Sequence, residues 1–152
     1  MPSHNRDPWV FAAFFLLFVF GGPAGFCLAS DAITIDVGSV YASNSGSGVD
    51  PSLVHIQGKL EYMFGYSSYK LLDRKRQKLS EGERKEFELP DKRSMRIKLL
   101  SVEGKKVRLY VRIEEKGNKL LGTTLGLSRG GMVLVGGPVH ESGVLIFLIS
   151  AD

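Results

Sequence analysis

The sequence predicts a mainly β domain of the α+β class, an antiparallel meander or small β-sandwich of about seven or eight strands with one N-terminal amphipathic helix packed on it. Three observations predict this class. Apolar and charged residues alternate through residues 94–113. Turn residues recur about every ten positions along the second half of the chain. One segment, residues 50–65, carries apolar residues at helical spacing.

The central feature is a β-hairpin over residues 94–113. Its residues alternate with period two, which sends apolar side chains to one sheet face and polar side chains to the other. The apolar set comprises Met95, Ile97, Leu99, Val107, Leu109, Val111 and Ile113, and the polar set comprises Arg96, Lys98, Arg108, Tyr110 and Arg112. Glu103-Gly104 lies where a tight hairpin turn requires a positive φ.

The helix is expected to begin at Asp50-Pro51, an N-cap acceptor followed by proline at the first helical position. Gly65 is typical of a left-handed C′ residue that ends a helix. The apolar stripe between them is expected to pack on the sheet, or alternatively to stay exposed for a partner helix. Its members are Leu53, Ile56, Leu60, Met63 and Phe64.

Further strands are expected from β-prone or alternating runs bounded by Gly, Pro, Asn and Ser. They cover residues 32–41, 66–79, 86–89, 120–127, 132–135 and 144–150. Residues 42–49 are rich in Ser and Gly and predict a flexible loop. Whether the first strand joins the main sheet stays open.

The last strand, 144–149, is apolar on both faces and is therefore expected to be central or sandwiched and not at a sheet edge. Residues 132–135 have the same character and carry the same expectation. Gly136-Gly137-Pro138 is expected to start a loop that contains His140 and Glu141. Deleting residues 144–152 should then abolish soluble expression.

The first 29 residues predict a secretory signal peptide. Arg6 precedes an unbroken apolar run, Trp9–Phe20, and Gly21-Gly22-Pro23 then interrupts any helix. Cleavage is expected after Ala29, or alternatively after Ala32 with Ser30 at position −3. An uncleaved anchor over residues 9–29 is the competing interpretation. The remaining chain divides into residues 30–49, the first strand and loop, and residues 50–152, a single helix-plus-β domain.

Composition favours an exported protein. The chain has 152 residues and a net charge of +4, and Arg6 and Asp7 balance, so cleavage leaves this charge unchanged. Cys27 is the one cysteine, so the mature protein would form no disulfide and would depend on its core for stability. We expect a periplasmic or secreted bacterial protein with no stable transmembrane span after cleavage.

A run of basic and aromatic residues predicts a binding face for an anionic polymer or lipid headgroup. Arg108, Tyr110 and Arg112 of the hairpin are expected on an outer face adjacent to the basic run. The set comprises Tyr66, Tyr69, Lys70, Arg74, Lys75, Arg76, Lys78, Arg108, Tyr110 and Arg112. The competing interpretation is a solvated edge strand whose cations resist aggregation. Cross-strand pairs from the next hairpin would then neutralise it, through Glu81, Glu83, Glu86 and Glu88.

Catalytic motifs are sparse. His140-Glu141 is the one combination that resembles an acid/base pair, and it would serve a small hydrolase. The histidines have no metal-ligand spacing, and neither a nucleophile elbow nor a phosphate-binding loop occurs, so we expect no metal and no cofactor.

Residues 123–138 read Thr-Thr-Leu-Gly-Leu-Ser-Arg-Gly-Gly-Met-Val-Leu-Val-Gly-Gly-Pro. This stretch resembles a hairpin of the bacterial secretin β-domain, in which a strand, a glycine-containing turn and an apolar strand ending in Gly-Gly occur. The resemblance covers sixteen residues and implies a role in envelope assembly.

The leading hypothesis is an exported, non-enzymatic β-rich domain that acts through contacts with a protein or an envelope component. The second is a binding module for an anionic glycan or lipid headgroup, and the third is the hydrolase. Nucleic acid is an unlikely partner for an exported protein.

Overall fold

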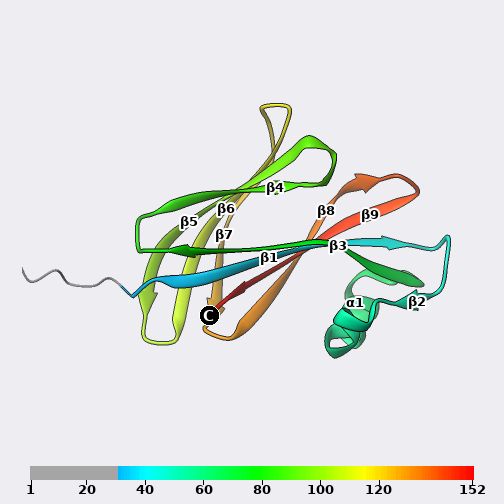
Figure 1. Cartoon of the computed structure of the whole chain (residues 1–152), viewed down its shortest axis with the longest axis horizontal. Coiled ribbons are helices and arrows are strands. Elements are labelled where there is room, and N and C mark those ends of the chain that lie inside the picture. The colour runs from blue at the N-terminus through cyan, green and yellow to red at the C-terminus, as the bar shows by residue number, and fades with distance from the viewer. Residues whose placement is uncertain (1–30) are drawn as a thin grey trace, which may run out of the picture.

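The computed structural model describes residues 31–152, and it shows a β-rich fold of two sheets with one short helical segment (Figure 1). The predicted signal peptide, with Ala29 and Ser30 of its cleavage region, lies outside the described residues. The strands are β1 Ile33–Ser43, β2 Gly48–Val49, β3 Ser68–Leu79, β4 Arg84–Leu89, β5 Arg93–Glu103, β6 Lys106–Glu115, β7 Asn118–Ser128, β8 Gly131–His140 and β9 Gly143–Ala151.

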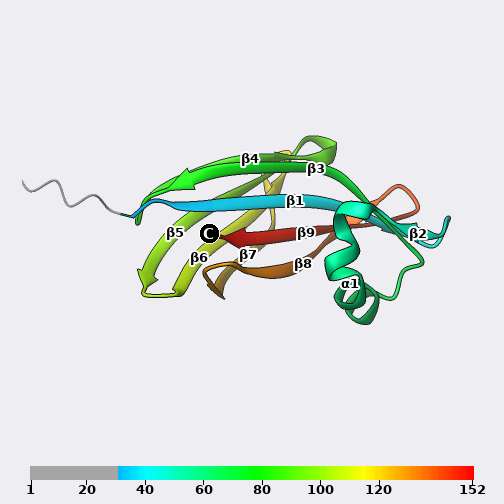
Figure 2. The ribbon, with the colours of Figure 1, turned by 60° about the horizontal axis from the view of Figure 1, so that its bottom comes forward.

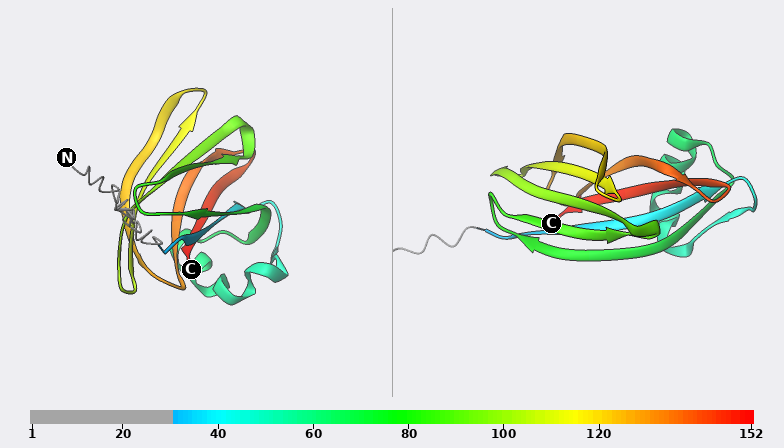
Figure 3. Two further views of the ribbon diagram at one scale, coloured as in Figure 1. Left: turned by 60° about the vertical axis from the view of Figure 1, so that its left-hand side comes forward. Right: turned by 90° about the horizontal axis from the view of Figure 1, so that it is seen from above.

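The strands form two sheets that pack face to face as a sandwich (Figure 3). Sheet A has the order β2-β3-β1-β9-β8, and sheet B has the order β4-β5-β6-β7. All pairs are antiparallel except the short β2–β3 contact. The predicted mainly β fold with a helix is therefore confirmed.

The core between the sheets is built by the alternation seen in the sequence. All seven apolar residues of the predicted hairpin are buried, and they face β1 and β9 of sheet A. The turn between β5 and β6 contains Gly104, with φ of 62°, as its position after Glu103 predicted.

The first strand is an integral part of this core. Strand β1 lies between β3 and β9 in sheet A, with Ile33, Ile35 and Val37 in the inter-sheet core. The segment after it is only partly a loop, because β1 continues to Ser43 and Gly48–Val49 pairs with β3. Residues 33–49 therefore belong to the same sandwich as the rest of the chain.

The helical segment covers the outer face of sheet A at one end (Figure 2). It consists of a 3-10 helix, Pro51–Ile56, followed by α1, Gln57–Phe64. Asp50 Oδ1 accepts a hydrogen bond from Ser52 N at 2.9 Å, which is the predicted N-cap. Leu53, Ile56 and Leu60 pack against β1, β3 and β9.

Met63 departs from the predicted stripe. It is 54% exposed, whereas Phe64, four residues after the buried Leu60 on the same α-helix, is half-buried against the sheet. None of the helices within residues 31–152, including the 3-10 helix Pro90–Lys92 between β4 and β5, is long and apolar enough to cross a membrane.

Strand β9 is central, as predicted, between β1 and β8, and both its faces are covered. The same expectation for residues 132–135 is wrong, because β8 is the edge strand of sheet A and pairs only with β9. The expected loop after Val135 is also wrong, since β8 continues through a bulge to His140. Strands β7 and β8 follow each other across the turn at 129–130 but belong to different sheets.

Candidate functional site

The predicted basic-aromatic face is divided between the two outer faces of the sandwich. Arg74, Arg76 and Lys78 alternate on β3 with residues that face the core, so they lie on the outer face of sheet A. Arg108, Tyr110 and Arg112 lie on the outer face of sheet B. The expectation that these two groups lie on adjacent surfaces is therefore wrong, because β3 and β6 belong to opposite layers.

The basic run on sheet A is partly neutralised by Asp36 of β1, whose single carboxylate is shared by two arginines. The Asp36 carboxylate accepts hydrogen bonds from Arg74 Nε at 2.8 Å and Arg76 Nε at 2.5 Å. This partner raises the pKa of Arg76 above its ordinary value. The expected cross-strand ladder with the next hairpin is absent, since β3 and β4 lie in different sheets, and of the four predicted glutamates Glu88 alone pairs with the run, at 3.9 Å from Lys75 Nζ, among the described residues.

Two residues of the predicted set are not part of the exposed basic surface: Tyr69 is covered by the helical segment, and Lys75 points to the other side of the sheet. Tyr69 is 1% exposed, and its hydroxyl donates to the Leu60 carbonyl at 2.9 Å and accepts from Tyr66 N at 3.0 Å. Burial raises the pKa of Tyr69. Lys75 points toward sheet B, where Nζ donates to the carbonyl of Glu88. Tyr69 is thus a core residue, whereas Tyr66 is half-buried and Lys70 exposed.

The outer face of sheet B carries the strongest concentration of positive charge. In the β4–β5–β6 ladder, Arg84 lies directly opposite Lys98, and Arg96 lies directly opposite Arg112. Like charges that face each other across a ladder destabilise a sheet. Two such pairs lie in neighbouring rows, and Tyr110 completes the row of Arg84 and Lys98.

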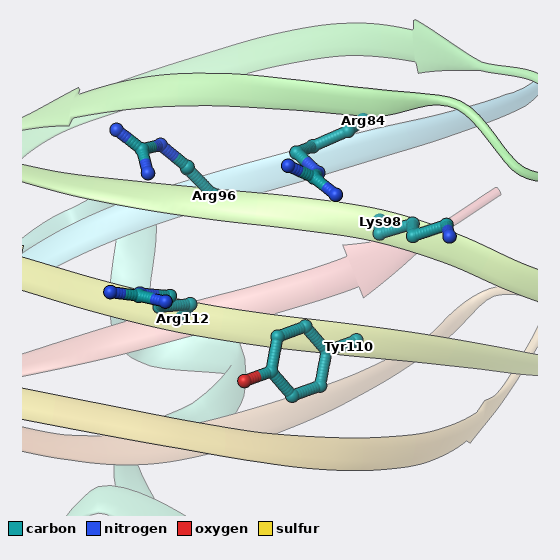
Figure 4. Close-up of a pocket in the computed structure, with 5 residues that line it drawn as sticks. All are labelled: Arg84, Arg96, Lys98, Tyr110 and Arg112. Atoms are coloured by element: carbon teal, nitrogen blue, oxygen red, sulfur yellow. The ribbon is translucent and has the colours of Figure 1, made fainter. Parts of the chain in front are cut away.

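These side chains line a shallow pocket of about 110 Å³ (Figure 4). Its lining consists of Arg84 from β4, Arg96 and Lys98 from β5, and Tyr110 and Arg112 from β6. The pocket has four cations and one aromatic ring, and every side chain comes from a paired strand. Its geometry is therefore set by the sheet rather than by loops.

Carboxylates compensate only one of the two like-charged pairs. Glu114, with a side chain 8% exposed, accepts from Arg96 Nη1 at 3.1 Å and Arg112 Nη2 at 2.5 Å. Glu86 pairs with Arg96 at 3.2 Å, which holds the pKa of Glu86 below its ordinary value. Arg84 and Lys98 have no carboxylate within 4.0 Å among residues 31–152. This half of the pocket is therefore open to an anion.

Strand β7 presents small residues, Gly122 and Gly126, to this face. Lys119 extends across Gly122, so that its Cε and Nζ lie 2.4 and 2.7 Å from where a Cβ at position 122 would stand. The Tyr110 hydroxyl lies 2.9 Å from the same point. At Gly126, no atom lies within 4 Å of the point where a Cβ would stand. A cation thus lies beside the tyrosine hydroxyl, and open space lies farther along β7.

A second polar cluster surrounds His140. Its Nδ1 contacts Asp91 Oδ2, and its ring packs edge-on against Tyr41 with centroids 5.3 Å apart. Arg93, with a side chain 8% exposed, binds Asp91 at 2.9 Å and Glu115 at 2.9 Å. This cluster joins the β4–β5 connection to the ends of β6 and β8.

The predicted His140–Glu141 pair is not formed. Glu141 is an exposed turn residue with φ of 49°, and Asp91 is the carboxylate that His140 contacts. A His–Asp pair can orient an imidazole for acid/base chemistry. The nearby Ser142 hydroxyl, however, hydrogen-bonds with Tyr41 and Ser45, each at 3.0 Å. Within the described chain, the geometry brings no activated nucleophile to His140.

Sequence reasoning missed Arg84, Arg96 and Lys98 as members of a site. The alternation in residues 94–113 already placed Arg96 and Lys98 on the same face as Tyr110 and Arg112. Arg84 could not be added, because its position depends on the β4–β5 register, which pairs it with Lys98. Asp91 was missed because it reaches His140 across 49 residues of sequence.

Comparison with known proteins gives no family for this chain: no protein-family model, no curated protein and no solved structure matches it.

Proposed function

We propose that this protein is a binding module for an anionic ligand, held on the outer face of sheet B. The observation that carries the proposal is the cross-strand pair of Arg84 and Lys98, two cations directly opposite each other with no carboxylate partner among the described residues. Arg96, Arg112 and Tyr110 complete the pocket beside them.

The energetics of the sheet support this function. A like-charged pair costs stability, and a Glu or Thr at either position would remove that cost. Residues that break a local rule of stability are expected at functional sites. An anion bound between Arg84 and Lys98 would turn their repulsion into two favourable contacts, and guanidinium groups suit sulfate, phosphate and carboxylate.

Binding is proposed in preference to catalysis. The pocket presents cations and an aromatic ring, whereas the acid/base candidate His140 lies in the other cluster, beside Asp91. The predicted signal peptide supports an exported protein, for which envelope or extracellular polyanions are accessible ligands. Contacts with a protein or an envelope component, including the secretin-like assembly role, stay a prediction.

The test compares the pocket on sheet B with exposed lysines of β3 in sheet A. The purified protein is titrated with fluorescently labelled heparin at several salt concentrations, and the affinity is measured by anisotropy. The double variant Arg84→Ala/Lys98→Ala should weaken binding about tenfold or more and reduce the log–log salt slope by about 1 to 2. The matched control, Lys70→Ala/Lys78→Ala, removes the same charge elsewhere on the protein and should stay within about twofold of wild type.

Equal losses in the two double variants would show that net charge alone attracts the polyanion, and the proposed site would be rejected. A larger loss in Lys70→Ala/Lys78→Ala would move the site to the residues first predicted from the sequence.

A further inference from the structure

We infer that the anionic ligand is a water-soluble acidic polysaccharide, one of whose sugar rings stacks on Tyr110. This inference rests on the function proposed above and adds the class of ligand. It starts from the position of Tyr110, which is surrounded by cations and yet presents its ring to the outside.

The ring of Tyr110 lies along the sheet, with its broad side visible from outside the pocket (Figure 4). Lys98 is its direct cross-strand neighbour, and Arg108 and Arg112 flank it on β6. Lys119 reaches the hydroxyl end of the ring from β7. A flat aromatic face with cations around its edge matches a sugar ring that carries anionic substituents, because the ring C–H groups pack on the negative aromatic face.

The surface beside the ring has room for a chain. Thr124 is the direct neighbour of Tyr110 on β7, and Gly122 and Gly126 lie opposite Arg112 and Arg108. Gly126 is exposed and has nothing within 4 Å above it. Lys119 covers Gly122, whereas Thr124 and Gly126 continue the floor of the pocket and leave it open on that side. A polymer can pass over them in an extended conformation.

The charges are distributed as a polymer requires. Each strand of sheet B contributes a cation with no carboxylate partner among the described residues: Arg84 on β4, Lys98 on β5, Arg108 on β6 and Lys119 on β7. Neighbouring strands lie about 4.8 Å apart, so these charges are spread over the width of the sheet. A ligand with a repeating negative charge can contact several of them at once.

A membrane surface fits this face less well. Membrane-surface binders usually add exposed apolar side chains that enter the lipid. The large exposed apolar residues of the described chain lie elsewhere: Val54, Tyr62 and Met63 in the helical segment, Leu72 on β3, Val139 on β8, and Leu120, which lines a hollow against β8.

Single-stranded nucleic acid also fits less well, because such ligands stack successive bases on several aromatic rings. Sheet B contains two aromatic residues, Phe87 and Tyr110, and Phe87 is buried in the core. A single exposed aromatic ring surrounded by cations favours a polymer that stacks one of its units on the ring and is otherwise held by charge.

The experiment separates stacking from charge with two probes, heparin and inorganic polyphosphate of matched total charge. Polyphosphate has no sugar ring, so it reports the cations alone. Tyr110→Ala should weaken heparin binding about fivefold or more, by analogy with the loss of a stacked base, and leave polyphosphate binding within about twofold. Tyr110→Phe keeps the ring and should retain heparin binding. Arg84→Ala/Lys98→Ala should weaken both probes.

A second variant makes the test independent of Tyr110. Gly126→Leu adds a side chain in the open space beside the ring and removes no charge, so heparin binding should fall while polyphosphate binding should not. Circular dichroism and a thermal melt establish that each variant is folded.

The possible failures can be told apart. Equal losses of heparin and polyphosphate binding in Tyr110→Ala, or no loss of either, would overturn the polysaccharide inference and leave the anion site standing. Tighter, Tyr110-dependent binding of oligo(dT), or tighter binding of phosphatidylglycerol vesicles, would overturn it in favour of those ligands. If wild type binds neither polyanion, the proposed function itself fails.

Discussion

Lys75 and Glu88 connect the two sheets along one side of the sandwich. Lys75 Nζ, on β3 of sheet A, donates a hydrogen bond to the main-chain carbonyl of Glu88 on β4 of sheet B, at 2.8 Å. Gln77 Nε2 bonds the carbonyl of Glu86 in the same way, also at 2.8 Å. Strand β4 is the edge of sheet B, so these side chains satisfy carbonyls that have no ladder partner.

Removing this connection should weaken the fold without affecting ligand binding. Lys75→Ala/Gln77→Ala should lower the free energy of unfolding by about 1–2 kcal/mol, the net worth of two hydrogen bonds. Urea denaturation measures the change, and Lys78→Ala is the control, because Lys78 lies on the same strand but points outward. An unchanged urea midpoint would show that the two carbonyls are equally well satisfied by water.

Gly143 should tolerate no side chain. A Cβ at this position would lie 2.0 Å from the Ala42 carbonyl oxygen, a backbone atom that cannot move aside. Gly143→Ala should therefore cost about 3 kcal/mol or more in unfolding free energy, at or beyond the upper end of the range for overpacking. Gly126→Ala, which has open space, should stay within about 0.5 kcal/mol. Thermal melts of the two variants compare the sites, and similar melting temperatures would contradict the packing of β9 against β1.

The C-terminal strand should be indispensable. Residues 144–152 contain Leu145, Phe147 and Ile149, which are fully buried in the inter-sheet core. Deleting them would leave β1 and β8 without their shared neighbour, and we expect no soluble folded protein. Phe147→Ala is the milder test and should cost about 3–5 kcal/mol. A folded, monomeric deletion variant would refute the central position of β9.

Glu114→Gln should change stability and binding in opposite directions. The Glu114 carboxylate is the shared partner of Arg96 and Arg112, so its loss should lower the unfolding free energy by about 1–3 kcal/mol. The same change frees two cations of the pocket, and heparin should bind more tightly. Anisotropy and urea denaturation on one preparation give both quantities. Weaker heparin binding by a folded variant would place the ligand outside the pocket.

Acid should destabilise the protein through Asp91. The hydrogen bond with His140, followed by the contact with Arg93, holds the pKa of Asp91 below its ordinary value of 3.8. A lowered folded-state pKa gives stability that is present above 3.8 and is lost as the pH falls through the folded-state value. Asp91→Asn should make the acid limb of a stability–pH curve shallower.

The matched control for this curve is Glu141→Gln, in the turn beside His140, because the Glu141 carboxylate makes no hydrogen bond or ion pair among the described residues. Urea midpoints between neutral pH and strong acid measure both variants. The same shallowing in both would show that the effect comes from net charge and not from the Asp91 contact.

Local patterns were sufficient where neighbouring residues decide the structure. Asp50 caps the helix through Ser52 because an Asx side chain can reach the second amide along the chain. The apolar members of the hairpin are buried because a period of two places them on one face. The prediction that residues 132–135 avoid the sheet edge was wrong, because apolar residues on both faces of a strand do not determine how many strands pair with it.

Part of the candidate site could be predicted from the sequence. Tyr110 and Arg112 were named, and Arg96 and Lys98 shared their face by alternation, but Arg84 joined them only through pairing register. Tyr69 was grouped with the basic face because it lies next to the cations in the sequence, yet its ring fills the space under α1. Burial of this kind depends on what packs above a strand.

The sequence by itself determined which residues of the 94–113 hairpin face inward and that the chain turns at Gly104, because these properties depend on spacing along one chain segment. Tertiary structure alone decided that β3 and β6 lie in opposite layers, that Asp36 pairs with both Arg74 and Arg76, and that Arg84 faces Lys98. The physical reason is that the interaction energy of two charges depends on their distance in space and not on their separation along the chain. Two cations far apart in sequence repel, or share an anion, only after the sheets have brought them together.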